Sequence, residues 1–125
     1  MYVYGTTDIG DTCSESQKLV ASDGVSDDRF GTAIAIHMNT VVVAAVLDNN
    51  EKGADAGAVY VYVHYGVAWS EIQKLLAADG SAGDWFGVSV AVHWDVIVVG
   101  AYYDDNEKGT NAGESKSCNS TKYES

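Results

Sequence analysis

The sequence predicts an all-β fold made of repeated four-stranded antiparallel units. Residues 17–57 align without a gap with residues 73–113, and about half of the aligned positions are identical. Tyr is frequent, Pro is absent, and no stretch has the apolar spacing of an amphipathic helix. The repeat offset, which separates Phe30 from Phe86, is long enough for four strands and their connections. These three observations define the fold class.

The complete unit has a pattern of four strands. The first strand alternates small Ala33 and Ala35 with bulky Ile34 and Ile36, so its two faces differ in size. The second is apolar on both faces, which is typical of a covered central strand. The third places Tyr60 and Tyr62 on one face, and the fourth is a weaker, outer strand. The predicted strands occupy residues 30–36, 40–46, 58–64 and 69–75.

The connections repeat with the strands. Met38-Asn39 and Trp94-Asp95 predict tight hairpin turns, because Asn and Asp tolerate the left-handed backbone that such turns need. The charged segments DNNEKGADAG and DDNEKGTNAG form longer loops between the second and third strands. Links ASDGVSDD and AADGSAGD join successive units.

The repeat region is predicted to cover residues 1–113. It comprises the last two strands of one unit (1–20), a complete unit (30–75) and the first two strands of another (86–102). Tyr2-Val3-Tyr4 repeats Tyr60-Val61-Tyr62. Residues 114–125 are polar and without alternation, so we expect a disordered tail and a chain that ends inside a unit. Unpaired edges of this kind favour self-association or residence in a longer repeat protein.

Charge and apolar patterning exclude some partners. The formal net charge of −11 argues against nucleic-acid binding, which depends on Lys and Arg neutralising phosphates. No run is long enough for a membrane span, and no signal peptide is visible, so either the protein stays in the cell or its N-terminus is missing. Whether Cys13 and Cys118 form a disulfide or remain thiols is open.

The repeated residues resemble the FG-GAP repeat, in the short variety that lacks a calcium loop. The resemblance depends on a set of spaced positions: Phe30, Gly31, Gly57, Tyr60, Tyr62, Phe86, Gly87, Gly100 and Ala101. It implies blades of an integrin-alpha-type β-propeller, here about two blades' worth and therefore an incomplete propeller. It also implies an extracellular or cell-surface location and a protein or glycan ligand. Both copies lack the proline of the family's Gly-Ala-Pro triplet, because Val46 and Tyr102 stand at that position.

Calcium is disfavoured as a cofactor. The connection between the first and second strands is too short for the calcium cage of integrin-type blades. The charged loops offer Asp48 and Asn50, and in the second copy Asp104 and Asn106, in a spacing that mimics the start of an EF-hand loop. Lys at the third ligand position of both copies favours a solvated loop instead.

Other candidate residues have simpler structural interpretations. His37 and His93 could line a shared site, but recurrence beside a turn favours a role in turn structure. Trp94 and the other two tryptophans could stack on ligands, whereas packing between blades is the commoner use. The recurring aspartates of the links are expected to cap turns, namely Asp23, Asp28, Asp79 and Asp84. Asn119 begins the one glycosylation sequon.

The chain has no nucleophile elbow, phosphate loop, zinc spacing or dinucleotide motif, which predicts that it is not an enzyme. The leading hypothesis is a non-catalytic repeat module that binds protein or glycan as part of a longer adhesion-like protein. The alternative is a truncated structural fragment without activity of its own. A propeller-type hydrolase or lyase is a remote third.

Overall fold

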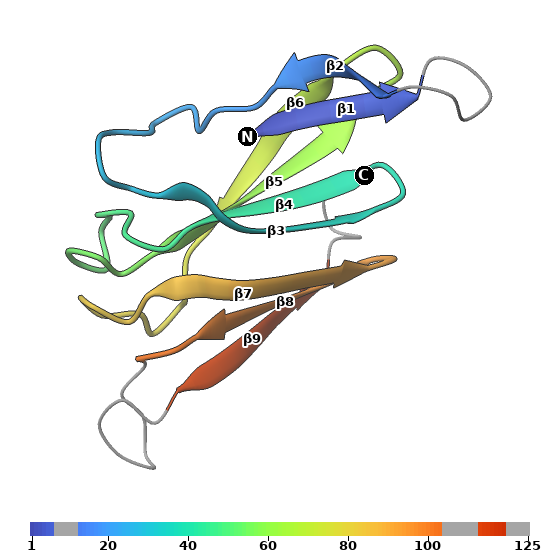
Figure 1. Cartoon of the computed structure of the whole chain (residues 1–125). Coiled ribbons are helices and arrows are strands. Elements are labelled where there is room, and N and C mark those ends of the chain that lie inside the picture. Colours follow the sequence, from blue (N-terminus) through green and yellow to red (C-terminus); the bar gives the residue numbers. More distant parts are fainter. Residues whose placement is uncertain (7–12, 104–112, 120–125) are drawn as a thin grey trace.

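Three antiparallel sheets stack on one another in the computed structural model, which describes residues 1–6, 13–103 and 113–119 (Figure 1). The first sheet pairs β1 with β2, the second has the order β3-β4-β5-β6, and the third has the order β7-β8-β9. This confirms the all-β prediction and the four-stranded unit. The strands are β1 (Tyr2–Thr6), β2 (Cys13–Lys18), β3 (Phe30–His37), β4 (Thr40–Ala45), β5 (Ala58–His64), β6 (Trp69–Leu75), β7 (Phe86–His93), β8 (Val96–Ala101) and β9 (Glu114–Asn119).

The second and third sheets repeat the same backbone geometry. In each, the first strand starts with a Phe-Gly pair and has an irregular register directly afterwards, between Phe30 and Ile34 or between Phe86 and Ser89. Left-handed backbone recurs at equivalent positions, 27 and 83, 29 and 85, 31 and 87, 38 and 94, and 57 and 113. A bulge that needs positive φ explains why glycine follows phenylalanine in both copies.

The hairpin turns close β3 to β4 and β7 to β8 with two residues each. Positive φ falls on Met38 and Trp94, at 55° and 50°, and not on Asn39 or Asp95. The turns are therefore where the sequence predicts them, but the assignment of the left-handed residue was wrong. At Trp94, the contacts with His37 described below hold the residue in a backbone conformation that large residues rarely adopt.

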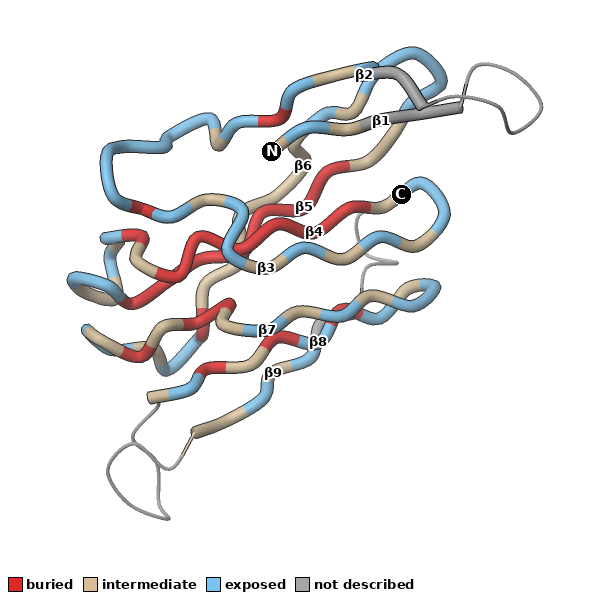
Figure 2. The backbone as a smooth tube through the Cα atoms, in the orientation of Figure 1, coloured by how far each residue is buried: buried red, intermediate tan, exposed pale blue. Residues whose placement is uncertain are grey.

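The core forms two layers on opposite faces of the second sheet. Buried residues are concentrated along β4 and β5 (Figure 2). One face of β4 and β5 packs against the third sheet, with Val42 and Val61 facing Ile97 and Val99. The other face packs against the first sheet, where Leu19 and Val3 lie among residues of β4 and β5. β4 is buried on both sides from Val41 to Ala45, as the doubly apolar sequence predicts. Each fully buried Val or Ile contributes about 1.5–3 kcal/mol to this packing.

Residues 114–119 form β9, so the prediction of a disordered tail is wrong for them, and the third sheet has three strands where two were expected. β9 follows β5 by one repeat, since Ala101 pairs with Glu114 as Ala45 pairs with Ala58. Its polar side chains hid the strand from pattern analysis. β9 is held by its backbone hydrogen bonds to β8 and by an ion pair of Lys116 with Asp79, and not by apolar packing. Residues 120–125 lie outside the described part of the chain.

Candidate functional site

The two hairpin turns lie side by side and bring their aromatic residues together. The rings of His37 and His93 are 4.8 Å apart between centroids, and the ring of His37 meets that of Trp94 edge to face at 5.0 Å. The backbone N–H of Trp94 donates a hydrogen bond to Nδ1 of His37 at 3.0 Å. This bond fixes the two turns relative to each other, because it joins one turn to the next across the inter-sheet boundary.

The turn residues form an exposed surface, which we call the turn surface and define as His37, Met38, His93 and Trp94. The side chains of Met38 and Trp94 are 68% and 62% exposed. Since Nδ1 of His37 accepts a hydrogen bond, a neutral His37 carries its proton on Nε2 and presents that N–H as a donor. The turn surface therefore offers an indole, a thioether and imidazole groups to a ligand. The two histidines do meet, and they do so together with a tryptophan that sequence reasoning treated separately.

The other two tryptophans pack within the molecule. Trp85 meets Tyr103 edge to face at 4.8 Å, and Trp69 lies 5.2 Å from His64. Both are partly buried. Trp69 and Trp85 therefore pack within the molecule, whereas Trp94 is exposed.

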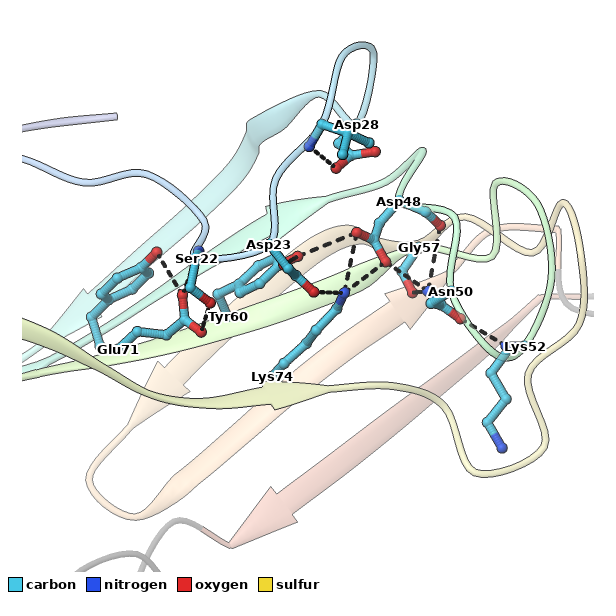
Figure 3. A network of polar contacts seen from close by, with 12 residues as sticks. Ser22, Asp23, Asp28, Asp48, Asn50, Lys52, Gly57, Tyr60, Glu71 and Lys74 are labelled. Carbon is cyan, nitrogen blue, oxygen red and sulfur yellow. Dashed lines mark hydrogen bonds and ion pairs between the residues drawn. The ribbon is translucent and has the colours of Figure 1, made fainter.

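A charged network joins the link 21–28 to β5, β6 and the first charged loop (Figure 3). Lys74 Nζ lies 2.6 Å from Asp23 and 3.1 Å from Asp48, whose side chain is almost fully buried. The hydroxyl of Tyr60 donates to Asp23 at 2.6 Å and also lies 3.2 Å from Asp48. In the same region Glu71 accepts hydrogen bonds from the backbone and hydroxyl of Ser22. The network holds the link and the first charged loop against β5 and β6.

The charges of this network shift its pKa values. Hydrogen bonding to Lys74 and then to Tyr60 lowers the pKa of Asp23. Burial opposes the charge of Lys74, but its bonds to Asp23 and Asp48 outweigh this effect and raise its pKa. Burial, followed by the neighbouring carboxylates, raises the pKa of Tyr60 far above its usual value. At neutral pH Asp23 is therefore a carboxylate, Lys74 an ammonium group and Tyr60 a neutral phenol.

The candidate calcium ligands of the first charged loop are occupied by protein groups. Asn50 Nδ2 donates to the carboxylate of Asp48 at 2.9 Å and to the carbonyl of Gly57 at 3.1 Å, while its Oδ1 accepts from the backbone of Lys52. These contacts point the two side chains at each other and at the loop backbone. Asp104 and Asn106 of the second loop lie outside the described residues. In the described segments, no three His, Cys, Asp or Glu side chains gather as a metal-binding group.

The third sheet replaces part of this network with one lysine. Lys116 Nζ lies 2.7 Å from Asp79 and 2.6 Å from Glu114, and it stands one repeat after Tyr60. Bonding to Asp79 raises the pKa of Lys116 and lowers that of Asp79. Lys74 and Lys116 are the functional residues of these networks that sequence reasoning missed. The recurrence of an aspartate in both links, at 23 and 79, was the available signal.

The link aspartates divide into two pairs. Asp28 and Asp84, which are buried, accept the backbone N–H of Val25 and Ser81 respectively, as the turn-capping prediction requires. The other pair, Asp23 and Asp79, binds lysine instead. In each link, the first of these aspartates therefore forms an ion pair and the second caps a turn.

The family-motif residues lie at structural positions. Phe30 stacks edge to face on Tyr60 and Tyr62, with centroids 5.5 and 6.3 Å apart. Gly57 and Gly87 lie where the second sheet meets the first strand of the third. Gly100 leaves space for the side chain of Ser89, and Ala101 is buried in the inter-sheet core, as is Phe86. Gly31 supplies the left-handed residue after Phe30. Asn119 ends β9, and its side chain and those of Cys13 and Cys118 lie outside what the structure describes.

The described part of the chain contains no helix long and apolar enough to cross a bilayer. No curated protein matches the sequence. The family model of the FG-GAP repeat matches residues 13–62 and 69–115, which together cover most of the chain and include the whole first and second strands of both copies. With the repeated bulges, the stacked antiparallel sheets and these two matches in view, the chain belongs to the FG-GAP repeat family.

Proposed function

We propose that this chain is a non-catalytic FG-GAP repeat module that binds a partner, in the manner of an adhesion protein, through the turn surface. The observation that carries the proposal is the exposure of Met38 and Trp94 next to the paired histidines. Trp and Met are enriched in protein interfaces, where large side chains supply most of the binding energy. A protein ligand is favoured over a glycan because Met adapts to apolar protein surfaces.

Family membership supports the non-catalytic part of the proposal, since the matched residues are the structural positions of a repeat unit. In the charged network, the carboxylates of Asp23 and Asp48 bind lysine and tyrosine side chains of β5 and β6. These contacts support a stabilising role. An extracellular location is part of the same proposal, as implied by the family.

The test is a binding comparison on panels of immobilised extracellular matrix proteins and of glycans. The probes are the whole chain, Trp94→Ala and a matched variant, Tyr102→Ala. Tyr102 is 61% exposed and follows β8, at the end of the strand away from the turn. We expect binding to a protein to fall at least tenfold in Trp94→Ala and to persist in Tyr102→Ala. Equal binding by both variants, or no binding to any panel member, would sink the proposal in favour of a structural fragment without activity.

A further inference from the structure

Two strands, β1 and β9, correspond to the third strand of a blade. β1 does so by its sequence and β9 by its position, and their side chains differ in polarity. β1 contains Tyr2-Val3-Tyr4, the counterpart of residues 60–62 in β5, whereas β9 has Lys116-Ser117-Cys118 at that position. β9 pairs with β8 in the register that β5 has with β4. In the described segments β1 pairs with β2 alone, so its other edge has no strand beside it.

An apolar groove lies along that edge of β1. It has a volume of about 230 Å³ and separates β1 from the exposed face of β3. Ile34 and Ile36 on this face are 55% and 62% exposed. Its lining residues are Met1, Tyr2, Val3, Ile34, Ala35, Ile36 and Val41.

The interface between the second and third sheets shows what fits against these isoleucines. Val90 and Val92 of β7 stand one repeat after Ile34 and Ile36, and they pack against the core layer that includes Ala33 and Ala35 of β3. The groove therefore lacks an inner strand with small residues facing it. A strand of that kind would bury the two isoleucines as β3 buries the two valines.

This chain carries such a strand on its other side. One repeat after Ala33 and Ala35 come Ser89 and Ala91, small residues on the exposed face of β7. The neighbouring Val98 of β8 pairs with Ala91 and is 39% exposed. The face of β7 and β8 and the groove beside β1 are thus the two halves of an interface that the chain already contains once.

β9 prevents a second copy from using these halves directly. β9 already pairs with the edge of β8 at which the β1 strand of a second copy would have to pair. The two strands cannot occupy that edge at the same time. β9 is the weaker candidate: none of its described side chains belongs to either core layer. Besides the backbone ladder, an ion pair joins Lys116 of β9 to Asp79 of the preceding link, and the side chain of Asp79 is 63% exposed.

We propose that a second copy of this chain binds by strand exchange, in which its β1–β2 hairpin replaces β9 on β8 and completes a four-stranded blade. Ile34 and Ile36 of that copy then cover Ser89 and Ala91. β9 competes with the β1 strand of a second copy for the edge of β8. Because β9 belongs to the same chain, its effective concentration is high, and the chain stays monomeric while β9 is paired. The contact is heterologous, so successive copies form either a ring or an open filament. This inference is independent of the turn surface.

The test uses full-length variants and measures mass by size-exclusion chromatography with light scattering over a hundredfold range of concentration. Lys116→Glu places a carboxylate beside Asp79 and Glu114 and should release β9. We expect this variant to form oligomers, with at least tenfold tighter self-association than the unaltered chain. Arg29→Glu is the matched control, because Arg29 is exposed and lies before β3, away from β9, so the same charge change there should leave the mass unchanged.

A second substitution identifies the groove as the contact. Ile34→Asp in the Lys116→Glu background should restore the monomer, whereas Val67→Asp should not, since Val67 is 95% exposed and lies in the link between β5 and β6. Asp79→Lys, which places a second cation beside Lys116, should assemble the chain as Lys116→Glu does. The inference is wrong if both Asp79→Lys and Lys116→Glu give folded monomers throughout, or if Ile34→Asp and Val67→Asp have equal effects.

Discussion

Gly57 lies against the backbone of Phe86, so close that a Cβ at position 57 would come within 2.2 Å of the Phe86 carbonyl oxygen. The N–H of Phe86 also donates a hydrogen bond to the carbonyl of Ala56 at 2.9 Å. The loop before β5 and the first residue of β7 are therefore joined backbone to backbone. This contact accounts for glycine at position 57, because a side chain there would overlap the backbone of Phe86.

Gly57→Ala should destabilise the fold more than Gly66→Ala. Both glycines have φ of +86°, so both variants suffer left-handed strain of about 1–2 kcal/mol. At Gly66 nothing lies within 4 Å of an added Cβ, whereas at Gly57 the overlap with Phe86 adds about 1–3 kcal/mol. Urea unfolding of the two variants gives the difference directly. Equal losses would show that the backbone contact is not rigid.

Lys74→Met should leave the buried carboxylate of Asp48 without its cation. A fully buried pair broken in this way costs about 3–5 kcal/mol, and we expect about 2–3 because Lys74 is partly exposed. Adding Asp48→Asn to Lys74→Met should recover part of the loss, since the amide carries no charge. The measurement is a double-mutant cycle by urea unfolding. Additive losses would contradict coupling between the two side chains.

The stability of the protein should fall in acid through Asp23. Its pKa is lower in the folded chain than its ordinary value of 3.8, so its contribution is present above that value and is lost as pH falls through the folded pKa. Asp23→Asn should lower stability at pH 7 and flatten the dependence below pH 4. Thermal unfolding of both proteins from pH 7 to pH 2 tests this. Parallel curves would assign the acid dependence to other carboxylates.

Tyr60 and Tyr62 should resist ionisation while the chain is folded. Burial raises both pKa values, with the carboxylates of Asp23 and Glu71 adding to the effect at Tyr60 and Tyr62 respectively. Stability is therefore unaffected below the ordinary tyrosine pKa of 10.0 and declines above it, where the unfolded chain ionises first. Absorbance of phenolate during an alkaline titration should include a fraction, contributed by Tyr60 and Tyr62, that appears only on unfolding. In Tyr60→Phe, this fraction should fall by the absorbance of one tyrosine.

His37→Ala should free the backbone N–H of Trp94, because that group donates to Nδ1 of His37. Hydrogen exchange at the Trp94 amide should then accelerate at least tenfold. His93→Ala retains the acceptor and provides the control. Slow exchange in both variants would mean that the turn is protected without the imidazole.

Much of the fold was predictable because the two repeat copies show the same pattern, so each supports the strand assignment of the other. The strands at 40–45, 58–64 and 69–75 match the predicted ranges within one residue, since apolar alternation and a covered central strand leave clear patterns. β9 was missed because its side chains are polar, while strand pairing uses backbone groups that no side-chain pattern reveals. The network around Lys74 was missed because its members come from separate elements.

The sequence by itself determined the repeat, the all-β class and the positions of turns, because these depend on local backbone preference and on periodic burial. The tertiary structure decided which side chains meet. Stacking of the sheets brought His37 to Trp94 and Lys116 to Asp79, and it left Ile34 and Ile36 beside an open groove. Contacts between residues far apart in the chain follow from how sheets pack and twist, and a one-dimensional pattern does not contain that geometry.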